Sequence, residues 1–131
     1  MTDSFWGQRI QASREVTIPL AFSKCEETGR YRNFVQAAEQ MKSEEDLGFV
    51  VRGLPFDDTD VYKTIEGASY LLQTYPDSRL EAYIDSILTL VSAAQEPDGY
   101  LYTARTKNPK NPHRWSGAER WIQIEDSHEL Y

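Results

Sequence analysis

The sequence predicts an all-α protein built around one antiparallel pair of helices. Apolar residues recur at helical spacing over residues 60–75 and again over residues 78–95. The first stripe comprises Val61, Ile65, Ala68 and Leu72, and the second comprises Leu80, Ile84, Ile87, Leu88 and Val91. Pro76 ends the first helix, because proline lacks the amide hydrogen that a helix interior needs. A link this short brings the second helix back antiparallel to the first.

The segment before this pair carries weaker helical signals. We expect residues 1–32 to be mostly irregular. Ile18 is expected to be extended, because Pro19 disfavours the helical conformation in the residue before it. The Thr-Gly-Arg stretch at 28–30 has the composition of a turn.

A short helix is predicted over residues 33–46. Its apolar positions Phe34, Ala37, Ala38 and Met41 recur at helical spacing. Glycine often follows a helix, so Gly48 is expected to end this one.

Acidic and hydroxyl side chains stand at the starts of the two long helices. Asp58 or Thr59 is predicted to cap the first helix, where a side-chain oxygen accepts from free backbone N–H groups. Asp57 and Asp60 belong to the same turn and are stabilised by the helix dipole. The Ser-Arg-Leu-Glu stretch at 78–81 fits a capping box that opens the second helix.

The second long helix is followed by a long connection. The Pro-Asp-Gly stretch at 97–99, with Asp98 at its centre, has strong turn chemistry. Residues 100–126 are predicted to be loop-like, with Trp115 and Trp121 anchoring the connection against the helices. His113 is expected to be an exposed loop residue.

The last five residues resemble the start of another helix. Ser127 is a candidate N-cap, and His128 to Tyr131 read as a first helical turn. A helix needs several turns to form its own backbone hydrogen bonds. We therefore expect residues 1–131 to be the N-terminal fragment of a longer domain. Apolar helix faces that neighbouring helices would cover are then expected to be exposed and to favour association.

Composition excludes several classes of function. Of 131 residues, 14 are Lys or Arg and 21 are Asp or Glu, which gives a net charge of −7. Such a charge opposes broad electrostatic binding to nucleic acid or to anionic membranes. A single cysteine, Cys25, excludes an internal disulfide and a multi-cysteine zinc site. The N-terminus has no signal-peptide pattern, so we expect a cytoplasmic location.

Several motifs, in this order and spacing, resemble one known family. The segments are FDDTDVYK at 56–63 with its continuation to residue 70, AQEPDGYL at 94–101 and SHELY at 127–131. The corresponding family segments read FxDSDVYKxxEAAAY, AQxxDGYL and SHELY. Together they resemble the N-terminal region of glycoside hydrolase family 127, the β-L-arabinofuranosidase group. Thr59 and Thr64 depart from the usual Ser and the frequent Trp of the family.

The resemblance implies an (α/α)6 barrel in which this chain supplies the first helices. It also implies a retaining glycosidase with a zinc-bound cysteine nucleophile and a glutamate acid/base. In the family all of these residues follow the HELY segment, so none corresponds to a residue of this chain. Cys25 is therefore not the nucleophile, and the chain alone is predicted to be inactive. His128 corresponds to a histidine that contacts the sugar, so a carbohydrate is the implied partner.

Two other functions remain open. The two long helices would also suit a small acidic hairpin module that binds a partner without any enzymatic activity. A different glycosidase would need two carboxylates facing each other across a cleft, drawn from Asp57–Asp60 and Asp98. These acidic residues are expected to serve as caps and turn residues instead, and Cys25 as a small buried residue.

Overall fold

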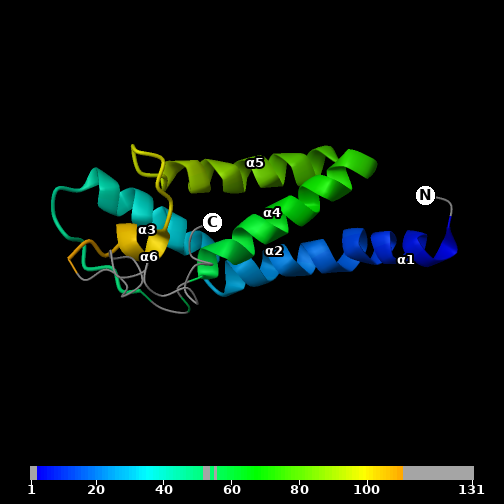
Figure 1. Ribbon diagram of the computed structural model, residues 1–131, viewed down its shortest axis with the longest axis horizontal. Coiled ribbons are helices and arrows are strands. Elements are labelled where there is room, and N and C mark those ends of the chain that lie inside the picture. Colours follow the sequence, from blue (N-terminus) through cyan, green and yellow to red (C-terminus); the bar gives the residue numbers. More distant parts are fainter. Residues whose placement is uncertain (1–2, 52–53, 55, 111–131) are drawn as a thin grey trace, which may run out of the picture.

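The computed structural model describes residues 3–51, 54 and 56–110, and this part of the chain is all helical, as predicted. The elements are α1 (Ser4–Ala12), the π-helical segment η1 (Ser13–Thr17), α2 (Ile18–Glu27), α3 (Arg30–Lys42), α4 (Asp57–Thr74), α5 (Ser78–Ala93) and α6 (Thr103–Thr106). Figure 1 shows α4 and α5 converging at one end of the molecule, with α3 and α6 gathered at the other. None of the described helices is long and apolar enough to cross a membrane.

The prediction that residues 1–32 are irregular is wrong. α1, η1 and α2 follow one another without a break and form one long helical run (Figure 1). Ile18 is helical, with φ −67° and ψ −47°, and its N–H bonds to the carbonyl of Ser13, five residues back. Pro19 stands in the first turn of α2, directly after this π-helical segment. The preference for an extended residue before proline is therefore overridden at Ile18 by the continuous helical run.

The turn at 28–30 and the next helix are confirmed, although the bounds of the helix differ. Gly29 adopts φ +80°, which glycine tolerates without strain, and α3 begins at the following residue. α3 ends at Lys42 rather than near Gly48. The Gln40 side chain donates to the carbonyl of Glu45 and accepts from the N–H of Leu47, so it fixes the chain leaving the helix.

The antiparallel hairpin of α4 and α5 is confirmed. The cap of α5 differs from the prediction, because the carboxylate of Asp77, not the hydroxyl of Ser78, accepts from the N–H groups of Arg79 and Leu80. Asp precedes Ser by one residue and is an equally good cap, so the sequence pattern leaves the start of the helix uncertain by one position.

The core lies where α2, α3, α4 and α5 meet. Its buried members are Phe22, Cys25, Phe34, Ala37, Val61, Ala68, Ile84, Ile87 and Ala94. Two edge-to-face ring contacts tie the helices together, with centroid distances of 6.0 Å for Phe34–Tyr62 and 5.1 Å for Phe22–Tyr83. The apolar residues of the three helices predicted over residues 33–46, 60–75 and 78–95 supply most of this core.

The connection after α5 starts as predicted and then differs. Gly99 has φ +91°, and the Asp98 carboxylate accepts from the N–H of Tyr100, so the turn is confirmed. The expected loop contains a short helix, α6, whose Thr103 and Thr106 are buried. The predictions for Trp115, Trp121 and His113 fall outside the described residues.

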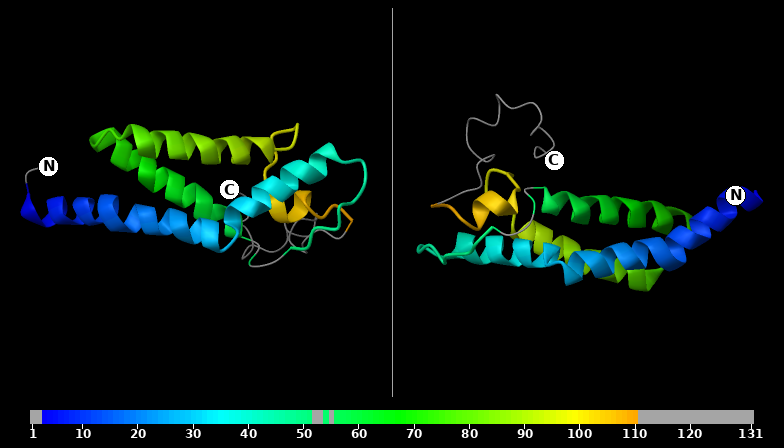
Figure 2. Two further views of the ribbon diagram at one scale, coloured as in Figure 1. Left: turned by 180° about the vertical axis from the view of Figure 1, so that it is seen from behind. Right: turned by 90° about the horizontal axis from the view of Figure 1, so that it is seen from below.

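Large apolar side chains remain exposed, as expected for this part of the chain. α1 has no buried residue, and its Phe5 and Trp6 are both 53% exposed. Figure 2 shows α1 projecting past the α4–α5 hairpin.

Candidate functional site

The predicted acidic cluster lies at the start of α4, but its carboxylates do not cap that helix. Phe56 occupies the N-cap position, and no side chain caps the helix there. The acidic side chains of the first turn reach other elements instead. The prediction that Asp58 or Thr59 caps this helix is therefore wrong, because no side chain caps it and the Thr59 hydroxyl donates to the carbonyl of Phe56 instead. The position of the acids at the positive end of the helix dipole still favours their charge.

Asp58 joins α4 to α6. The Thr103 N–H donates to Asp58 Oδ2 at 2.8 Å, and the Thr103 hydroxyl donates to Asp58 Oδ1 at 2.7 Å. Asp58 and Thr103 are both buried, with 6% and 2% of their surface exposed. Burial raises the pKa of Asp58, while the hydrogen bonds from Thr103 and the charge of Lys107 oppose that rise. Both carboxylate oxygens of Asp58 therefore accept hydrogen bonds from a residue that lies 45 positions away in the sequence.

Arg30, the first residue of α3, holds the other two carboxylates. Its Nη2 lies 3.2 Å from Asp57 Oδ1 and 3.1 Å from Asp60 Oδ2, and its Nε donates to the same Asp60 oxygen at 3.2 Å. Burial raises the pKa of Asp57, and the neighbouring guanidinium opposes the rise. The ion pairs of Arg30 with these two carboxylates therefore link the start of α3 to the start of α4.

Lys107 lies directly after α6. We call this residue, together with Asp57, Asp58, Asp60 and Arg30, the Asp58 cluster. Lys107 is only 2% exposed, and its Nζ donates to Asn33 Oδ1 at 2.7 Å and to Gln36 Oε1 at 3.5 Å. Burial lowers the pKa of this ammonium group, and the charges of Asp58 and Asp57 oppose that lowering. Lys107 also lines a surface depression of about 550 Å³ beside the turn at Gly29.

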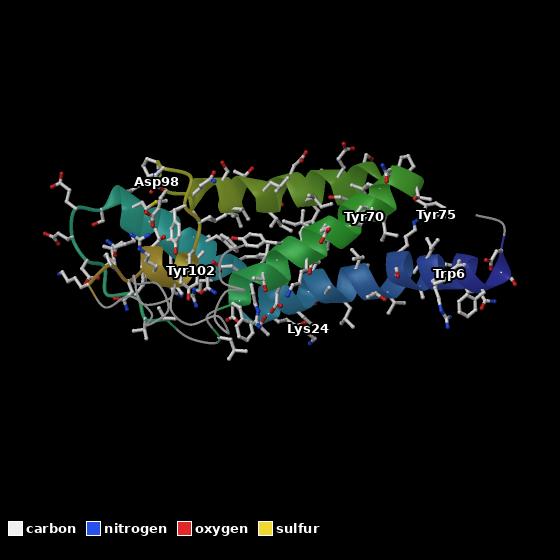
Figure 3. The ribbon with its side chains drawn as sticks, viewed as in Figure 1. Trp6, Lys24, Tyr70, Tyr75, Asp98 and Tyr102 are labelled. Carbon is white, nitrogen blue, oxygen red and sulfur yellow. The ribbon has the colours of Figure 1, made fainter. Side chains whose placement is uncertain are left out.

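This arrangement is suited to fixing chain segments rather than to acid–base chemistry. The carboxylates of Asp57, Asp58 and Asp60 are engaged by Arg30 and Thr103. The turn carboxylate of Asp98 lies on the same end of the molecule as Tyr102 (Figure 3) and accepts from the chain's own backbone. The hypothesis of a glycosidase that uses these carboxylates therefore gains no support.

Sequence reasoning missed Arg30, Thr103 and Lys107. No local pattern marks them, because each finds its partner on an element far along the chain. A weak signal was present: a threonine and a lysine follow the Pro-Asp-Gly turn, on the stretch that returns toward the acidic start of α4.

The remaining predicted site residues fall into two groups. His128, the predicted sugar contact, lies outside the described residues. Cys25 is described and is buried, with Sγ 4.0 Å from Thr64 Oγ1. Burial raises the pKa of its thiol, which keeps it protonated and unreactive. The interpretation of Cys25 as a small buried residue is confirmed.

Comparison with families and curated proteins identifies relatives of this chain. The family described as β-L-arabinofuranosidase, GH127 catalytic domain, matches residues 1–131. The non-reducing end β-L-arabinofuranosidase of Bifidobacterium longum subsp. longum is 40% identical over 80 residues, which cover 60% of this chain and 12% of that protein.

Two solved structures share the fold. A GH127 β-arabinofuranosidase superposes with a TM-score of 0.85 at 70% identity, over 99% of this chain and 20% of that one. A GH127 β-L-arabinofuranosidase from Geobacillus stearothermophilus T6 gives a TM-score of 0.79 at 32% identity, over 100% of this chain and 20% of that one. The chain thus spans about a fifth of these relatives. On the match over its whole length, the chain belongs to the β-L-arabinofuranosidase catalytic-domain family, glycoside hydrolase family 127.

Proposed function

We propose that this chain supplies the N-terminal helices of the catalytic domain of a retaining β-L-arabinofuranosidase. The enzyme would remove terminal β-L-arabinofuranosyl units from a glycan. The observation that carries the proposal is the 70% identity and TM-score of 0.85 to a GH127 β-arabinofuranosidase over 99% of this chain. A small interaction module without enzymatic activity has no observation of its own in its favour.

The proposed barrel gives the described helices a defined role. α4 and α5 would form one antiparallel pair of an (α/α)6 barrel, and further pairs would cover their open sides. The exposed apolar side chains of this part of the chain, among them Leu20, Tyr70 and Leu88, support that proposal. The buried cluster around Asp58 would then fix the end of the pair from which the chain continues toward His128.

His128 is the residue that we propose to contact the sugar. An imidazole N–H at the start of a helix is able to donate to a sugar hydroxyl. The nucleophilic cysteine, the glutamate acid/base and the zinc ligands are proposed to come from outside this chain. Among the described residues, no group of three His, Cys, Asp or Glu side chains is placed to hold a metal ion. Zinc would activate a thiolate, and no described residue is assigned to it.

A chimera tests the proposal. This chain would replace the corresponding N-terminal fifth of the 70% identical β-arabinofuranosidase, and hydrolysis of an aryl β-L-arabinofuranoside would be measured. We expect activity from the chimera and none from the purified chain. His128→Ala in the chimera is expected to lower kcat/KM by about 100-fold or more, since a lost transition-state hydrogen bond to sugar costs about 3 kcal/mol.

His113→Ala is the matched control, because it removes the other histidine of the chain and is expected to leave kcat/KM unchanged. An inactive chimera with a native circular dichroism spectrum would contradict the assignment. Turnover by the purified chain, with contaminating enzyme excluded, would contradict the prediction that its catalytic residues lie elsewhere.

A further inference from the structure

We draw no further inference here: the strongest candidate, the surface depression of about 550 Å³ between the start of α3 and Lys107, carries nothing, because the Lys107 ammonium already donates to Asn33 and Gln36 and nothing in the described part of the structure shows what covers or occupies the depression.

Discussion

The side chains of Asp58 and Asp77 each accept two hydrogen bonds, but Asp77 stabilises a single helix and Asp58 stabilises the packing of two distant elements. Asp77 accepts from the N–H groups of Arg79 and Leu80, at 3.0 and 3.2 Å, and so stabilises the start of its own helix. Asp58 is buried and accepts from Thr103, 45 positions away. The comparison teaches that an acidic residue near a helix start is not by itself a cap. Its partner depends on which segment returns to cover it.

The largest expected effect comes from Asp58→Ala. The substitution would leave the two buried donors of Thr103 without an acceptor and would remove the negative charge that Lys107 faces. Leaving a buried hydrogen-bonding group without its partner costs about 1–3 kcal/mol, and more where the lost partner is charged. Urea denaturation of the purified chain should show this loss in the free energy of unfolding. A loss below about 1 kcal/mol would mean that the cluster does not hold α6 in place.

Asp77→Ala is expected to cost about 1 kcal/mol, because it removes only a local helix cap. The same denaturation experiment measures it. Ser78→Ala is the control and should change little, since the Ser78 hydroxyl is not the cap. If Ser78→Ala were the more costly substitution, the helix would start one residue later than the structure shows.

The smallest effect is a pH dependence that distinguishes the two aspartates. Burial raises the pKa of Asp58 above its ordinary value of 3.8, so the folded chain binds that proton more readily than the unfolded chain. Stability from this group is therefore gained as the pH falls through the interval just above 3.8. Relative to Asp58→Asn, the unaltered chain should gain stability on acidification. Asp57 titrates in both proteins, so its contribution cancels, and an opposite slope would reject the burial argument.

Local sequence patterns were sufficient to predict the two long helices. Their apolar stripes include Val61, Ala68, Ile84 and Ile87, which are all buried in the core. The turn at Gly99 was also predictable, because proline, aspartate and glycine each have a conformational reason to be there. These features depend on residues within a few positions of one another.

Features that depend on distant residues were not predictable. The partner of Asp58 lies on α6, a four-residue helix with no periodicity long enough to recognise. Arg30 was assigned to a turn, and its ion pairs with Asp57 and Asp60 become apparent only after α3 and α4 are packed. The helical N-terminal run was also missed, because the rule for a residue before proline is only a preference, and Ile18 adopts helical angles within a run that continues from Ser13–Thr17 into α2.

That π turn has a consequence for what α1 can contact. A π-helical turn holds one residue more than the α-helical turn it replaces, and each residue of a helix adds about 100° of rotation. The side chains of α1 are therefore turned by roughly that angle from the direction that the buried face of α2, with Phe22 and Cys25, would give them. Deleting one residue within η1 would restore the α-helical register and swing Phe5 and Trp6 to another side of the molecule. The length of this short segment, rather than its composition, thus sets the direction of the exposed rings of Phe5 and Trp6.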